Sequence, residues 1–198
     1  MLDKQQADNL MKIKGNVRGE GILTDVKYVR YQKGEEGVKI VEKKLEELGY
    51  LTKFKDIKPM EWYPEGLDVL VVLVIKDVFN WANKDIFEMG SFAAKVSFLV
   101  RMLMKYFLSP EKSFKESPRY WATNFDFGEL EAYKFDEKNK FMVFRLREYN
   151  SHPIMCVDLA GYFLQMAKYV SNNKEVAIEE TKCAFRGDEF HEYTIKWA

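Results

Sequence analysis

The sequence predicts an α+β fold in which helices pack on an antiparallel sheet and can enclose a hydrophobic cavity. Three observations support this prediction. Several segments have the length and apolar spacing of helices, two pairs of short alternating segments are joined by polar turns, and strands do not alternate with helices as they do around a parallel sheet. The length of 198 residues suits one core, so we expect a single domain over residues 1–198.

The charge balance argues against a nucleic-acid-binding protein. The 31 basic and 31 acidic residues cancel, which leaves no global field to attract nucleic acid or an anionic membrane. Residues 1–14 lack the apolar run of a signal peptide, and no segment reaches the roughly 18 apolar residues of a membrane span. We therefore expect a cytoplasmic protein, in which Cys156 and Cys183 are free thiols or metal ligands.

Three segments of the first half are expected to be helical. Residues 34–49 place apolar side chains at near-helical spacing, and Gly49 closes the pattern. Residues 67–83 are almost wholly apolar, and their length favours a helix although their valines would suit a strand. Residues 86–108 are apolar around most of the circumference, so we expect a central buried helix with Asp85 as N-cap, ended by Pro110.

The second half predicts two hairpins around a helix. Residues 109–128 mix aromatic residues with turn formers and are expected to be a loop with one short helix. Residues 129–150 alternate around a polar tip at 136–140, which is typical of a hairpin. Residues 157–173 form an amphipathic pattern, and 174–197 read as two strands that turn at Gly187.

The segment CAFRGDEFH, residues 183–191, holds one of the two cysteines and one of the two histidines. A three-residue loop at 186–188 would place Cys183 opposite His191, whereas a two-residue loop would turn the cysteine to the other face. His191 shares its parity with Tyr193, Ile195 and Trp197 and so belongs to the more apolar side of its strand. These residues alone favour core packing, with a metal site as the alternative.

Residues 151–197 resemble the C-terminal half of the 4-vinyl reductase type, or hydrocarbon-binding, domain. The shared features are a cysteine that opens a glycine-containing helix, a strand, and then cysteine, glycine, aspartate and a terminal ligand eight residues after the cysteine. That family is related to the haem–nitric oxide sensor and TRAPP-type folds. The resemblance implies helices and an antiparallel sheet around a hydrophobic ligand cavity.

The resemblance also implies a zinc site. Its four ligand positions fall on Cys156, Glu180, Cys183 and His191, with His191 in place of the usual final cysteine, a replacement that zinc accepts. On an undistorted strand Glu179 shares a face with Cys183, so Glu180 can be the ligand only if the strand has a bulge. Four protein ligands leave no open position for water, so this zinc would be structural and would staple the subregion at about 150–198.

Function is then expected to lie in the apolar middle of the chain. The candidate wall of a ligand pocket consists of Val74, Val78, Phe79, Phe92, Val96, Leu99 and Trp121, although the same residues could simply form the core. Haem is not expected, because the only histidines are His152 and His191 and neither lies on the central helix. Sequence motifs for phosphate loops or catalytic triads are absent.

Together these features favour a non-enzymatic domain that binds or senses a hydrophobic or aromatic small molecule, as a homodimer like the proteins it resembles. Two alternatives stay open. One is a protein-interaction scaffold of TRAPP type, which would have a solid core. The other is an enzyme or accessory factor in tetrapyrrole reduction, which rests on the name of the family alone.

Overall fold

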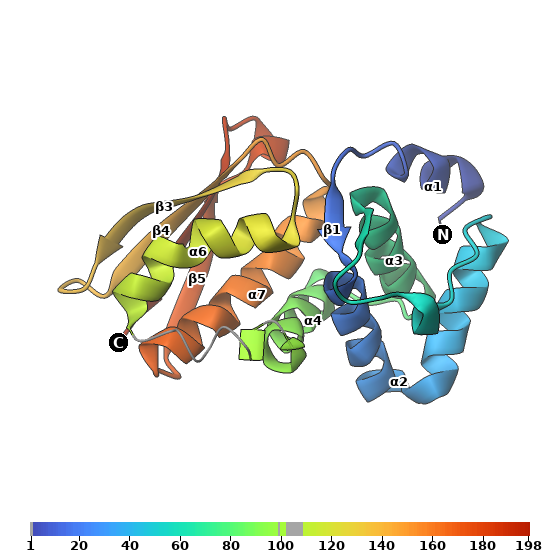
Figure 1. Cartoon of the computed structure of the whole chain (residues 1–198), viewed down its shortest axis with the longest axis horizontal. Coiled ribbons are helices and arrows are strands. Elements are labelled where there is room, and N and C mark those ends of the chain that lie inside the picture. Colours follow the sequence, from blue (N-terminus) through green and yellow to red (C-terminus); the bar gives the residue numbers. More distant parts are fainter. Residues whose placement is uncertain (1, 99, 102–108) are drawn as a thin grey trace.

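The computed structural model describes residues 2–98, 100, 101 and 109–198. The N-terminal helices form one half of the molecule and a four-stranded sheet forms the other, with two helices running between the halves (Figure 1). The fold is α+β, as predicted. No helix in the described part of the chain is both long enough and apolar enough to span a membrane.

The helices alternate with short connections along the chain. Their bounds are α1 Lys4–Leu10, α2 Gly19–Glu47, α3 Glu65–Val78, α4 Asn83–Val96, α6 Pro110–Asn124 and α7 Pro153–Ser171, with single 3-10 turns η1 Phe54–Asp56 and η2 Ala184–Arg186. The predicted helix over 34–49 corresponds to the second half of α2. Helix α2 begins earlier, at Gly19, and is kinked at Gly34, where φ is +68°. The helical interpretation of 67–83 is confirmed over 67–78 by α3, which ends at Val78, whereas residues 79–82 form a turn before α4.

All strands pair antiparallel. The main sheet has the order β3-β4-β6-β5, built from β3 Glu129–Asp136, β4 Phe141–Arg147, β6 His191–Trp197 and β5 Val176–Lys182, and a small sheet pairs β1 Asn16–Arg18 with β2 Trp62–Pro64. Both predicted hairpins are therefore present. They lie side by side because β4 pairs with β6.

One face of the main sheet packs against helices. The register sets Met142 beside Ile195 and Phe144 beside Tyr193, and all four side chains are buried. Helix α6 packs along β3 and helix α7 packs along β5 and β6, so both cover this inner face (Figure 1). The next pair in the row sets Leu146 beside His191, which places the histidine on the inner face, as its parity predicts.

The structure corrects the prediction of a mainly irregular segment over 109–128. Helix α6 occupies fifteen residues of it, with Ser109 as N-cap and Pro118 inside the helix. A proline in a helix leaves the carbonyl four residues earlier without its N–H partner. Here the hydroxyl of Ser117 donates to that carbonyl, on Phe114, over 2.6 Å, which explains why the helix continues.

The structure also corrects the prediction of one helix over 86–108. Helix α4 ends at Val96, because Ser97 is extended and the N–H of Phe98 donates to Oε1 of Glu20 over 2.8 Å. The N-cap residue of α4 is Ala82, and Asp85 lies in the first turn of the helix. The carboxylate of Asp85 accepts from the N–H of Ala82, so Asp85 stabilises the helix N-terminus from inside the helix. Residues 102–108 of the predicted helix lie outside the described residues.

Candidate metal centre and cavity

A bulge in β5 determines which glutamate faces the interior. Glu180 pairs with Tyr193 and Lys182 pairs with Glu192, so Thr181 is an extra residue between them. Because of the bulge, the side chain of Glu180 lies on the same side of the strand as that of Cys183. Glu179 is exposed. The connection to β6 is longer than either predicted loop, because β5 ends at Lys182 and the turn η2 precedes Gly187.

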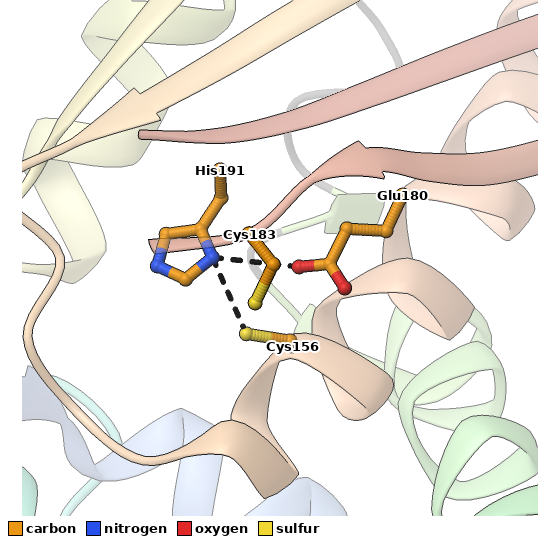
Figure 2. A group of neighbouring side chains, drawn as sticks. All are labelled: Cys156, Glu180, Cys183 and His191. Carbon is orange, nitrogen blue, oxygen red and sulfur yellow. Dashed lines mark hydrogen bonds and ion pairs between the residues drawn. The ribbon is translucent and has the colours of Figure 1, made fainter. Parts of the chain in front are cut away.

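The start of α7 supplies the fourth side chain of the group. His152 is the N-cap, and its Nδ1 accepts from the N–H of Ile154 over 3.1 Å, while Pro153 occupies the first helical position. Cys156 therefore lies in the first turn of α7. Its side chain points toward the end of the β5–β6 hairpin (Figure 2).

Cys156, Glu180, Cys183 and His191 form a group whose ligand atoms all lie within 4.8 Å of one another (Figure 2). Nδ1 of His191 is 3.5 Å from Sγ of Cys156 and 3.4 Å from Oε1 of Glu180. Tetrahedral zinc with ordinary bond lengths would hold sulfur and nitrogen about 3.6 Å apart, and nitrogen and oxygen about 3.4 Å apart. The group could therefore bind a metal ion with little movement.

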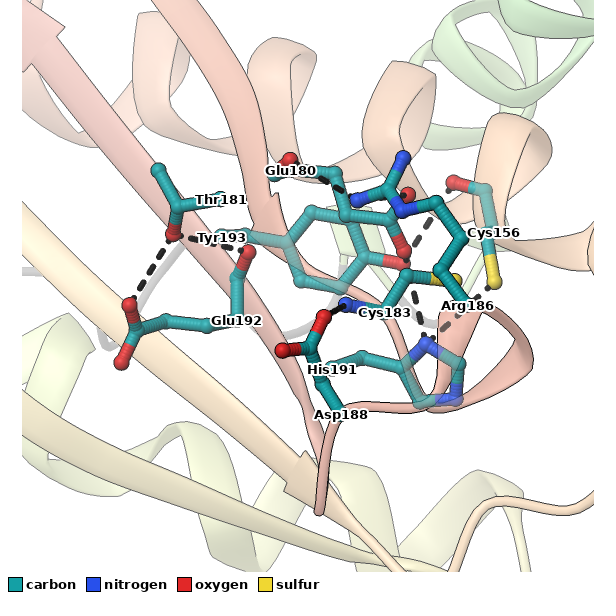
Figure 3. Close-up of polar contacts among 9 residues, drawn as sticks. All are labelled: Cys156, Glu180, Thr181, Cys183, Arg186, Asp188, His191, Glu192 and Tyr193. Carbon is teal, nitrogen blue, oxygen red and sulfur yellow. Dashed lines mark hydrogen bonds and ion pairs between the residues drawn. The ribbon is translucent and has the colours of Figure 1, made fainter.

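Neighbouring groups orient these side chains. Nε2 of His191 lies 3.2 Å from the carbonyl oxygen of Tyr149, so a proton on Nε2 would leave Nδ1 free as the ligand nitrogen. Arg186 lies 3.6 Å from Oε2 of Glu180, the oxygen that does not face the histidine. Asp188 accepts from the N–H of Cys183 over 2.8 Å (Figure 3). These contacts match the outer shell that usually holds metal ligands in place.

The electrostatics of the group follow from its burial. Burial, with the nearby charge of Glu180, raises the pKa of the thiols of Cys156 and Cys183 above the ordinary value. Burial also opposes the charge of Glu180, but hydrogen bonds that involve His191 and Cys183 outweigh it and lower the pKa of this carboxyl. The group thus combines one carboxylate with two buried thiols and a buried imidazole.

A cavity of about 180 Å³ lies between the inner face of the sheet and the helices. Its apolar wall includes Phe114, Trp121, Phe144, Phe163 and Ile195, which come from α6, β4, α7 and β6. The rings of Phe114 and Phe144 are 4.9 Å apart, and the indole N–H of Trp121 donates to the carbonyl of Gly128 over 2.9 Å. A dry cavity of about 150 Å³ is large enough to bind benzene, so this one suits a ligand built on one ring.

Most of the predicted pocket residues lie elsewhere. Trp121 lines the cavity, whereas Val74, Val78, Phe79, Phe92 and Val96 do not, and Leu99 lies outside the described residues. Val74 is fully buried on α3, a helix that packs against α2. A helix that is apolar around its whole circumference does not reveal in its sequence which face meets a cavity and which meets a neighbour.

The sequence analysis missed the carboxyl groups of the interior. Glu20, Asp25, Asp68 and Asp158 line the cavity, and Glu65 is fully buried nearby on α3. Burial raises the pKa of Asp68 to about 7 and, together with the charge of Asp68, that of Asp158 to about 8. The available signal was a single acid inside an apolar run, as in LDVLVV around Asp68 and MCVDLA around Asp158.

No protein-family model matches the chain, and no curated protein matches it. Solved structures do. An H-NOX protein from S. oneidensis in the Fe(II)NO ligation state superposes with a TM-score of 0.70 at 13% identity, over 91% of this chain and 99% of that one. The chain has the H-NOX fold. An oxygen-binding H-NOX domain related to soluble guanylate cyclases superposes with a TM-score of 0.62 at 15% identity, over 91% of this chain and 94% of that one.

The cavity does not fit the haem of H-NOX proteins. Neither histidine lines it, because His152 caps α7 and His191 belongs to the cysteine group. Haem also carries two propionates, which would meet the carboxyl groups of Asp25, Asp68 and Asp158 if they entered that side of the cavity. The fold is thus shared with H-NOX proteins, while the residues that surround the cavity do not suit haem.

Proposed function

We propose that this chain is a non-enzymatic small-molecule-binding or sensor domain of the 4-vinyl reductase type. Its hydrophobic or aromatic ligand occupies the cavity between α6, α7 and the sheet. The observation that carries the proposal is the aromatic wall around a cavity of about 180 Å³ inside an H-NOX fold. Pockets of this kind bind apolar ligands and orient them with a few polar groups.

The four-residue group is assigned to a structural zinc ion. Two thiolates, an imidazole nitrogen and a carboxylate oxygen are ordinary zinc ligands, and four of them leave no position open for a water nucleophile. The ion would join the end of the β5–β6 hairpin to the first turn of α7. Because α7 and β6 both line the cavity, this zinc would also fix two of its walls.

Elemental analysis combined with native mass spectrometry of untagged protein tests this proposal. We expect about one zinc per chain and an additional mass from a co-purifying apolar molecule, and we expect each particle to be a homodimer. Folded protein that contains no zinc and binds no aromatic probe would contradict the proposal, and it would favour a scaffold of TRAPP type.

A further inference from the structure

Three aspartates on three different helices border the same cavity. Asp25 is on α2, Asp68 on α3 and Asp158 on α7, and the charges of the other two act on Asp25. Asp25 and Asp68 are each only 4% exposed. Like charges this close repel one another, and burial removes the water that would screen them. Such a cluster either keeps protons on its carboxyl groups or is stabilised by a positive charge that joins it.

The protein supplies no such charge among the residues that the structure describes. No lysine, arginine or histidine in that part of the chain forms an ion pair with any of the three aspartates, and Oδ1 of Asp68 and Oδ1 of Asp158 are buried without a hydrogen-bond partner. Arg18 also borders the cavity, but its guanidinium donates to the carbonyls of Thr123 and Met60 and lies 3.7 Å from the ring centroid of Trp62. Lys27 pairs with Glu20, another acid of the cavity wall, over 3.8 Å, so a positive charge that joins the three aspartates would have to come from a ligand.

The arrangement suits an organic cation better than a metal ion. Among the described residues, the cysteine group at His191 is the one place where three or more ligand atoms gather within 4.8 Å, so the three aspartates do not converge on a single point. The rest of the cavity wall is apolar and aromatic, with Trp121 and Phe163 among its members. Aromatic faces attract ammonium groups and cover apolar bodies equally well.

We propose that the ligand is a small amine whose ammonium group pairs with the unpartnered carboxyl of Asp68, with Asp25 and Asp158 adding negative charge on the same side of the cavity, while its apolar body lies against the aromatic wall. This inference rests on the proposed function, because it names the class of molecule in the same cavity. The size of the cavity limits the ligand to about one ring with a short chain. Gly21 contributes room beside Asp68, since a Cβ there would still lie 4.0 Å from Oδ2.

Isothermal titration with a matched pair of probes tests the inference. We would use 2-phenylethylamine and 2-phenylethanol, which have nearly the same shape and differ in charge. We expect the amine to bind about tenfold or more tightly than the alcohol. Asp68→Asn should bring the two affinities within about threefold of each other, since it removes one of the charges that select the amine. Asp77→Asn, on the same helix but outside the cavity, should leave the preference unchanged.

The possible outcomes separate the two proposals. If the alcohol binds as tightly as the amine, the charge does not select the ligand and this inference fails, while the proposed binding function stands. If neither probe binds to folded protein, both fail. Tight binding of Mg²⁺ or Ca²⁺ that depends on Asp68 would identify an inorganic cation and overturn the amine. Should Asp68→Asn not fold, Asp25→Asn provides the same comparison.

Discussion

Nδ1 of His191 lies 3.5 Å from Sγ of Cys156, although the two residues are 35 positions apart in the chain. The first belongs to the start of β6 and the second to the first turn of α7. Strand pairing holds β6 within the sheet but does not attach it to α7. The contact between these two side chains joins the end of the hairpin to the helix. A metal ion bound at this contact would therefore contribute directly to the stability of the hairpin.

Replacing Cys183 with serine should release the metal and destabilise the hairpin. A hydroxyl is a much weaker zinc ligand than a thiolate, so the binding free energy that supports folding is lost. We expect the free energy of unfolding to fall by roughly 3 kcal/mol or more, and amide exchange over 176–197 to become faster. Denaturant unfolding and hydrogen exchange measure these effects. A chelator should reproduce them in the unchanged protein, and an unchanged stability in both cases would refute the zinc site.

Glu180 and Glu179 allow a matched test of the bulge in β5. Glu180→Gln replaces a carboxylate of the four-residue group and should weaken zinc binding by about tenfold or more. Glu179→Gln makes the same change on the exposed side of the strand and should leave zinc binding as it is. Competition with a fluorescent zinc indicator measures both affinities. The opposite order of effects would mean that β5 lacks the bulge at Thr181.

The sequence predicted the hairpins and the four-residue group more fully than it predicted the cavity. Alternation located β4 and β6, and the structure brings together the four side chains from Cys156 to His191 that the sequence pattern named. The cavity depends instead on where helices end and how they cross. Helix α4 ends before Ser97, where the N–H of Phe98 donates to Oε1 of Glu20, 78 residues earlier in the chain. No local sequence pattern predicts a contact between residues so far apart.

Asp68 should make the stability of the protein fall as the pH rises from about 4 to 7. Burial raises the pKa of this carboxyl to about 7 from an ordinary value of 3.8, so within this window the unfolded chain has released a proton that the folded chain retains. Asp25 from α2, Asp158 from α7 and Glu65 from α3 are the acids around it, and burial raises their pKa values as well.

The change attributable to Asp68 should be on the order of a few kcal/mol. Urea unfolding at a series of pH values measures it, and the difference from Asp68→Asn isolates this residue from the other titrating groups. Below about pH 4 Asp68 is neutral in both the folded and the unfolded chain. In that range the difference in unfolding free energy between Asp68→Asn and the unchanged protein should therefore be constant. Parallel curves across the whole range would contradict the assignment.

Two glycines beside the buried aspartates should respond in opposite ways to the same substitution. At Gly21, in α2, a Cβ would meet nothing closer than 3.4 Å, so Gly21→Ala should raise the free energy of unfolding by about 0.5–1 kcal/mol through helix propensity. At Gly90, in α4, a Cβ would lie 2.0 Å from the carbonyl oxygen of Asp158, so Gly90→Ala must push α4 away from α7. That separation should cost roughly 1–3 kcal/mol. Thermal unfolding of the two variants distinguishes them, and similar melting temperatures would show that α4 and α7 do not approach so closely at Gly90.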